Sequence, residues 1–139
     1  MNDYNMVLET AITFGDAARA IEKRFNGVLR GEEGFAKSHL TDYDAEVICK
    51  ANTLVCGFDP FSGRNVTFSY QFELLVGGAF RKRADELGFN RIPLDDRKKM
   101  YRYLSGMESN VYPEALLKLR KLLSDVSGDL LSKLVSMKN

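Results

Sequence analysis

The chain has 139 residues, of which 45% are hydrophobic and 28% are charged, and its formal net charge is +1. This composition argues against a disordered chain, because enough apolar surface is present to form a core, and the length predicts one domain over residues 1–139. Cys49 and Cys56 are the two cysteines of the chain, which is too few for a disulfide scaffold or a zinc site of cysteines alone.

The first segment carries a seam of apolar or small residues whose spacing alternates between three and four. One face of a helix produces this spacing, and a strand does not. We therefore expect a helix over this segment, with Gly27 and Gly31 as places where it stops. The seam consists of Tyr4, Val7, Ala11, Phe14, Ala18, Ile21, Phe25 and Val28.

A second helix is expected to begin at Thr41, because Thr41 and Asp44 resemble a capping box in which aspartate replaces glutamate. The apolar residues that follow fit a helix better than a strand. Residues 59–63 then have the composition of a turn. The apolar positions of this second helix are Val47, Ile48, Ala51, Leu54, Val55 and Phe58.

The third segment predicts a buried central helix over about residues 66–88, because its apolar residues lie on two opposite faces. Gly77 and Gly78 fall inside it, at a cost of about 1 kcal/mol each relative to alanine. We interpret them as a candidate helix-contact notch, made either for packing within the domain or for a partner. One stripe comprises Phe68, Phe72, Leu75, Val76, Ala79 and Phe80, and the other comprises Val66, Tyr70, Leu74 and Gly77.

Two further helices are expected, a short one after Pro93 over residues 94–104 and a long one from Pro113 to the end. The five helices together predict an all-α, bundle-like single domain. The last helix has more apolar residues than one contact face requires, which favours a homodimer. Its seam is Leu116, Leu119, Leu123, Val126, Leu130, Leu134 and Met137, and it is widened by Leu117, Leu122, Leu131 and Val135.

The residues offer little catalytic or metal-binding chemistry. His39 is the sole histidine, and no nucleophile-elbow, phosphate-loop or dinucleotide-binding pattern accompanies it. Asp42, Asp44 and Glu46 are spaced so that a helix splays them apart, and they are explained as favourable charges at a helix start. We therefore expect no enzyme activity, no cofactor and no bound metal.

Charge is unevenly distributed along the chain. Residues 1–60 contain ten acidic and six basic side chains, a balance of −4, whereas residues 61–139 contain nine acidic and fourteen basic side chains, a balance of +5. The excess predicts a basic patch that binds phosphates, binds an acidic protein surface, or simply faces solvent. The candidate patch residues are Arg81, Lys82, Arg91, Arg97, Lys98, Lys99 and Arg102.

Residues 81–105 also resemble a helix-turn-helix module, with Ala84 in the first helix and Gly88 in the turn. Against this interpretation, Arg83 and Arg97 stand where apolar residues are expected. The aspartates at positions 95 and 96 would repel phosphates at the start of the second helix.

The longest apolar run, residues 74–80, is far shorter than the roughly 20 residues that a membrane span needs. The chain also opens without the features of a signal peptide, so we expect a cytoplasmic protein that does not enter the membrane. Our hypothesis is a non-enzymatic helical interaction protein, a regulator or inhibitor of cellular or viral origin, with an unidentified protein partner. The alternative is a nucleic-acid-binding regulator that uses residues 81–105.

Overall fold

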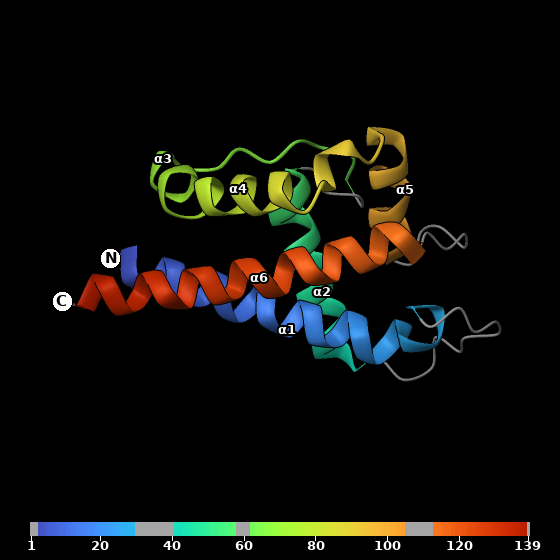
Figure 1. The fold of residues 1–139 in the computed structure, drawn as a ribbon, viewed down its shortest axis with the longest axis horizontal. Helices are drawn as coiled ribbons and strands as arrows, with labels where there is room; N and C mark the ends of the chain where they lie inside the picture. The colour runs from blue at the N-terminus through green and yellow to red at the C-terminus, as the bar shows by residue number, and fades with distance from the viewer. Residues whose placement is uncertain (1–2, 30–40, 58–61, 105–112, 139) are drawn as a thin grey trace.

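The computed structural model describes residues 3–29, 41–57, 62–104 and 113–138, and the regular elements among them are all helical (Figure 1). The segments α3, η2 and α4 form one continuous rod, so the described residues form five helical rods. This confirms the prediction of an all-α, bundle-like fold with five helices. In chain order the elements are α1 (Asp3–Leu29), α2 (Asp42–Cys56), α3 (Tyr70–Phe72), the π-helical turn η2 (Glu73–Gly77), α4 (Gly78–Glu86), the 3-10 turn η3 (Phe89–Arg91), α5 (Leu94–Leu104) and α6 (Pro113–Lys138).

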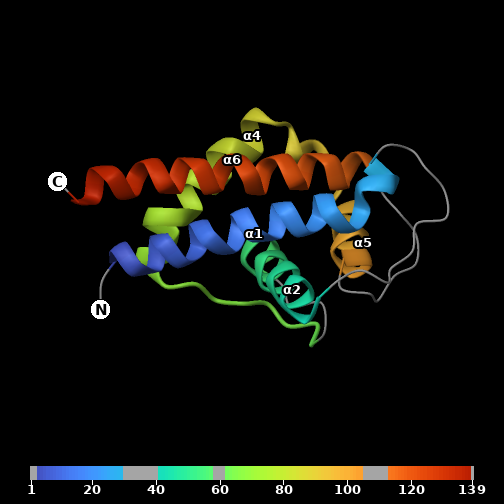
Figure 2. The same ribbon diagram turned by 90° about the horizontal axis from the view of Figure 1, so that it is seen from below.

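The long helices α1 and α6 run antiparallel, side by side, and form the centre of the core (Figures 1 and 2). Both predicted seams are buried in the core that surrounds this contact, and burial of apolar surface is the main term that holds the helices together. The seam predictions are thus confirmed, except that Val28 lies outside the described side chains. Fully buried seam residues are Val7, Phe14 and Ile21 on α1 and Leu116, Leu119, Leu123, Val126 and Leu130 on α6.

Small residues bring α1 and α6 close together at mid-length. The buried Ser127 hydroxyl donates a hydrogen bond of 2.7 Å to the backbone carbonyl of Ala11 on the facing helix. A Cβ atom at Gly15 would lie only 3.0 Å from the same hydroxyl oxygen. The absence of a side chain at Gly15 therefore allows the backbones to approach.

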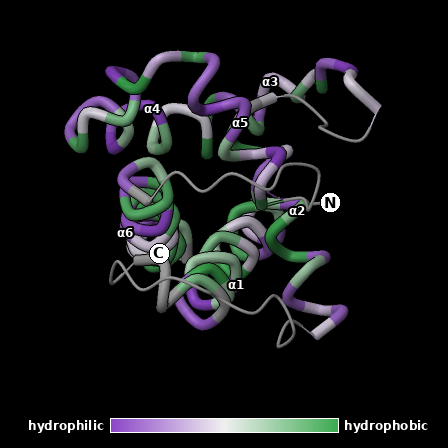
Figure 3. Tube along the Cα trace, turned by 90° about the vertical axis from the view of Figure 1, so that its right-hand side faces the viewer, coloured by the Kyte–Doolittle hydropathy of each residue, from purple (hydrophilic) through white to green (hydrophobic). Residues whose placement is uncertain are grey.

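Helix α2 packs against α1, on the side of α1 that lies away from α6 (Figure 3). Its start is capped as predicted, because the Thr41 hydroxyl accepts a hydrogen bond of 3.1 Å from the backbone N–H of Asp44. It ends at Gly57, whose φ of 64° is the left-handed conformation that glycine adopts without strain. Asn52, on the buried face of α2, is only 1% exposed, and neither amide atom has a hydrogen-bond partner among the described residues.

The helix predicted over about residues 66–88 is present from Tyr70 to Glu86, but the prediction that it is a buried central helix is wrong. The rod begins at Tyr70, where the Ser69 hydroxyl accepts from the backbone N–H of Phe72, and it lies on the outside of the α1–α6 pair (Figure 3). Tyr70 is 79% exposed and Leu74 is 57% exposed, so these two residues of the second predicted stripe face solvent. The first stripe does pack inward: Val76 is buried, and Phe72, Leu75, Ala79 and Phe80 are half-buried.

Candidate interaction surface

One side of the α1–α6 pair is covered by no helix in the described part of the chain (Figure 3). We call this side the α1–α6 face and define it by Ile12 and Gly15 on α1 and by Gly128, Leu131 and Val135 on α6. Three of its residues are large, apolar and exposed: Ile12 by 49%, Leu131 by 47% and Val135 by 66%. Exposed apolar side chains that gather on one surface are typical of interaction sites.

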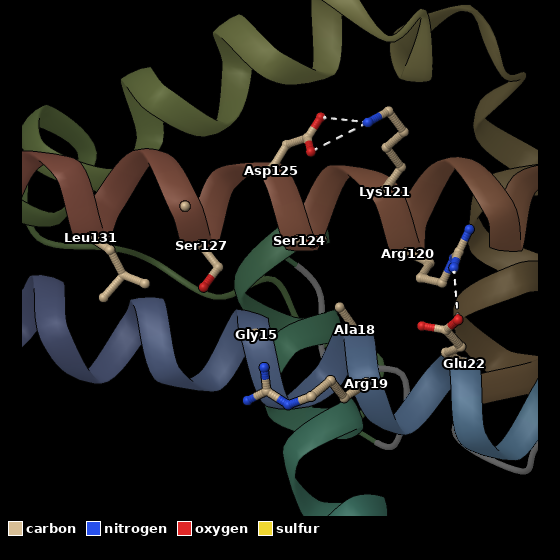
Figure 4. Close-up of a pocket in the computed structure, with 11 residues that line it drawn as sticks. Gly15, Ala18, Arg19, Glu22, Arg120, Lys121, Ser124, Asp125, Ser127 and Leu131 are labelled. Atoms are coloured by element: carbon tan, nitrogen blue, oxygen red, sulfur yellow. Dashed lines mark hydrogen bonds and ion pairs between the residues drawn. The ribbon is translucent and has the colours of Figure 1, made fainter.

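A shallow hollow of about 390 Å³ lies in this face, between α1 and α6 (Figure 4). Small residues leave the space open, since a Cβ atom at Gly128 would meet no heavy atom within 4 Å. Leu131 borders one end of the hollow, and charged residues border the other. The lining residues are Gly15, Ala18, Arg19, Glu22, Arg120, Lys121, Ser124, Asp125, Ser127, Gly128 and Leu131.

The charged residues of the hollow are paired with one another. Nη1 of Arg120 lies 3.3 Å from a carboxylate oxygen of Glu22, which ties α6 to α1, and Lys121 lies 3.2 Å from Asp125 (Figure 4). The cations and anions in these pairs balance, so this end of the hollow has little net charge. It resembles the polar rim of a protein interface more than an anion-binding site.

The third cation of the hollow, Arg19, pairs with Asp16 at the edge of the face. Asp16 also accepts a hydrogen bond of 2.5 Å from the hydroxyl of Tyr43 on α2. This hydrogen bond raises the pKa of Tyr43, because the neutral phenol donates to a carboxylate. The side of the face nearest α2 is therefore fixed by a small polar network.

The predicted basic patch is spread over α4, η3 and α5, and part of it is engaged within the fold. Arg81 pairs with Glu73 at 2.7 Å, and the guanidinium of Arg97 lies 5.9 Å from the centre of the Phe89 ring. Other patch cations make no ion pair with any described residue. Those are Lys82 and Arg91, which are exposed, and Lys99 and Arg102, which are half-exposed.

Two helices lie where the helix-turn-helix interpretation requires them, since α4 ends at Glu86 and α5 begins at Leu94. Gly88 has a φ of 71°, as a glycine in such a turn should. However, α5 packs mainly on α2 and α6 and has few contacts with α4. Asp95 is exposed at the start of α5, which is the end that would enter a DNA groove.

Gly77 and Gly78 differ in their surroundings. A Cβ atom at Gly77 would lie 2.6 Å from the carboxylate of Glu73 and 3.1 Å from the guanidinium of Arg81, so the Glu73–Arg81 ion pair occupies that space. Gly78 has no heavy atom within 4 Å of its Cβ position. Gly77 also lines a hollow that α1 and α2 border, whereas Gly78 is exposed, so the helix-contact notch stays a prediction, both for packing within the domain and for a partner.

Sequence reasoning missed the π-helical turn η2, which carries Gly77 at its end. Beside it lies a second hollow, of about 230 Å³, between α1, α2 and the rod. The wider spacing of a π-helical turn lets the side chains on either side of it face the same hollow. Apolar residues dominate its lining, which includes Phe14, Leu54, Val55, Phe68, Phe72, Val76 and Phe80.

The described residues contain no group of three or more histidine, cysteine, aspartate or glutamate side chains that would hold a metal ion. His39 lies outside the described residues. Asp44, at the start of α2, faces Lys23 at 3.9 Å, and Cys49 is half-buried in the same helix.

One ion pair of the fold has two hydrogen bonds and a carboxyl group whose pKa is lowered. Nε and Nη2 of Arg83 on α4 donate hydrogen bonds of 2.6 and 2.9 Å to the two carboxylate oxygens of Asp129 on α6. The pair lowers the pKa of Asp129 and raises that of Arg83. It joins two helices and lines neither of the two hollows, so its role is structural.

None of the described helices is long and apolar enough to cross a membrane. Comparisons with protein-family models, with curated proteins and with solved structures gave no match to this chain.

Proposed function

We propose that this protein is a non-enzymatic binding module, a regulator or inhibitor that acts by attaching its α1–α6 face to another macromolecule. The observation that carries the proposal is the exposure of Ile12 on α1 and of Leu131 and Val135 on α6, together with the hollow between these helices that Gly15, Gly128 and Leu131 line. Leaving these side chains in water costs about 25 cal/mol per Å² of apolar surface, and a partner that covers them removes this cost.

The composition of the face supports a protein partner. An apolar centre surrounded by paired charges is the usual arrangement of protein–protein interfaces. Phosphate groups of a nucleic acid would instead require cations that are not already neutralised. In the hollow each of the cations Arg19, Arg120 and Lys121 has a carboxylate partner.

The test compares three forms of the full chain: wild type, Leu131→Asp and the matched control Leu74→Asp. Leu74 is the same residue type with similar exposure, 57% against 47%, but lies on the rod of α3, η2 and α4. Each form is immobilised and exposed to extract of the native host together with a soluble, differently tagged copy of itself. We expect the wild type and Leu74→Asp to retain the same macromolecules, and Leu131→Asp to lose at least one of them. Equal retention by all three forms would reject the proposal.

A second candidate function is nucleic-acid binding through the basic patch, and it is favoured by four of its cations that form no ion pair with a described residue. Lys82 and Arg91 lie on α4 and η3, and Lys99 and Arg102 lie on α5. Retention of the chain on duplex DNA and RNA, measured at about 50 mM and at raised salt, tests this function. Each phosphate contact that is lost lowers the slope of log binding constant against log salt concentration by about one. Reversing these four charges should abolish retention, and a wild type that is not retained at low salt rules this function out.

A further inference from the structure

We infer that the macromolecule bound by the α1–α6 face is a second copy of this chain, attached antiparallel about a two-fold axis that passes between Asp129 and Leu130 of α6. This inference rests on the proposed function, because it names the occupant of the same face. Four observations carry it: the order of residue sizes along α6, the hollow, the charge balance and the size of the face.

The exposed stripe of α6 is complementary to itself. It consists of Ser124, Gly128, Leu131 and Val135, all exposed, at successive spacings of four, three and four. These spacings are the same in both directions along the helix. The side chains, however, are small at Ser124 and Gly128 and large at Leu131 and Val135. When two stripes run antiparallel, Leu131 of each copy meets Gly128 of the other, and Val135 meets Ser124. In a parallel pairing large residues would meet large ones and leave a void at the small ones, which is costly.

The hollow lies where this pairing would place the large side chains. Gly128 and Ser124 both line it, and nothing occupies the space above Gly128. Leu131 and Val135 of the second copy would enter the hollow from solvent, while Ile12, which is exposed on α1 three residues before Gly15, would extend the apolar contact. Insertion of side chains into holes on a facing helix is how antiparallel helices associate in bundles.

The charges of the face allow two copies to approach. Three ion pairs leave no net charge around the hollow: Arg120 with Glu22, Lys121 with Asp125, and Arg19 with Asp16. Two identical surfaces with a large net charge would repel each other, and this one does not. The basic patch on α4, η3 and α5 could not serve as such a symmetric interface, because it would bring like charges together.

The dimensions of the face suit a reversible dimer. Around the proposed axis the two α6 helices overlap over residues 121–138, which is about 27 Å at 1.5 Å per residue. Two adjacent helices present a face about 20 Å wide, so the contact covers on the order of 1,000 Å² over both copies. This is near the lower limit for a specific interface, and we expect a dissociation constant in the micromolar range.

Sedimentation velocity of the full chain between about 1 and 200 µM tests the dimer. The wild type and Leu74→Asp should pass from monomer to dimer with rising concentration. Leu131→Asp should weaken the dimer on the order of 100-fold, because the pairing buries its carboxylate in an apolar contact. Leu131 is exposed in the single chain, so circular dichroism should show unchanged helix content. A wild type that stays monomeric at 200 µM, or a Leu131→Asp variant that dimerises normally, overturns the inference.

Gly128→Leu tests the register. This variant makes the face more apolar, so a surface that associates without a fixed register would associate more strongly. In the antiparallel register the new side chain fills the hole for Leu131 of the second copy, and dimerisation should weaken at least about 10-fold. Gly78→Leu is the matched control, since Gly78 is also an exposed helical glycine with open space around its Cβ position. Stronger dimerisation of Gly128→Leu would overturn the register.

Failure of the dimer and failure of the proposed function give different results. If the wild type is monomeric but Leu131→Asp still loses another host macromolecule, the inference fails and the proposed function stands. If Leu131→Asp changes neither self-association nor retention, both fail.

Discussion

Replacing Gly78 with alanine should stabilise the fold by about 1 kcal/mol, which is the difference in helix propensity between the two residues. Gly78 has ordinary helical dihedral angles, with φ −62° and ψ −45°, and its Cβ position has no heavy atom within 4 Å. The added methyl group therefore meets no obstacle. For a chain of 139 residues the entropy of unfolding is about 0.3 kcal/mol per kelvin, so Tm should rise by about 3–4 °C.

The neighbouring substitution Gly77→Ala provides the comparison. It gains the same propensity, but its methyl group would displace the Glu73 carboxylate from Arg81. Both side chains of this ion pair are well exposed, so its loss costs at most about 1 kcal/mol. The stabilisation by Gly77→Ala should therefore be smaller than that by Gly78→Ala, and close to zero when the ion pair is lost completely.

Urea denaturation of the two variants and the wild type measures this difference in the free energy of unfolding. A shift of the midpoint with an unchanged m-value reports a change in stability. The measurement uses a low protein concentration, at which the chain is monomeric. The free energies of unfolding then contain no contribution from contacts between these glycines and a partner. A destabilised Gly78→Ala would show that this position packs against another part of the chain. Equal stabilisation by the two variants would show that the Glu73–Arg81 pair does not occupy the space beside Gly77.

Other substitutions test the core and the polar contacts of the fold. Leu119→Ala should lower the free energy of unfolding by about 2–5 kcal/mol in urea denaturation, because Leu119 is fully buried between α1 and α6, and a smaller loss would place it outside the core. Asn52→Leu should raise that free energy by about 1 kcal/mol or more, since it removes two buried amide atoms without partners, and a loss would reveal a polar contact of Asn52. Asp129→Asn should destabilise the fold at neutral pH but not in acid. The pKa of Asp129 is lowered in the fold by Arg83, so its contribution is present above the ordinary carboxyl pKa near 4 and is lost as pH falls through the lowered value. Unfolding curves that differ equally at pH 7 and at pH 2 would contradict this assignment.

The seams of the first and last helices were predictable because each is long and regular. Val7, Phe14 and Ile21 on α1 repeat at helical spacing without interruption, and the structure buries all of them. The cap at Thr41 was also readable, since capping depends on local hydrogen bonds. The last helix does carry apolar residues beyond those of its contact face, because Leu131 is exposed. Leu122, which was predicted to belong to this excess, is fully buried.

The position of the third helix could not be read from its own residues. Apolar residues on two faces suggested burial on all sides, but α1 and α6 already fill the centre of the core. The rod therefore packs on the outside of this pair, and its outer side is left uncovered. Tyr70 and Leu74 consequently face solvent.

The hollow in the α1–α6 face depends on two helices that are more than 80 residues apart in the sequence. Gly15 and Gly128 are each unremarkable within their own helix, and only the antiparallel contact brings them to one surface. The pairing of Arg120 with Glu22 likewise joins the two ends of the chain. Sequence patterns describe the face of a single helix and do not show which faces adjoin.

Two-dimensional NMR spectra of the uniformly ¹⁵N-labelled chain, recorded at about 20 and 500 µM, test most directly that the α1–α6 face binds a second copy of the chain. We predict that the amide signals of Ile12, Gly128, Leu131 and Val135 shift or broaden with concentration, whereas those of Gly78 and Lys82 stay unchanged. Concentration-dependent changes confined to α4 and α5, or spectra that are identical at both concentrations, would contradict the account.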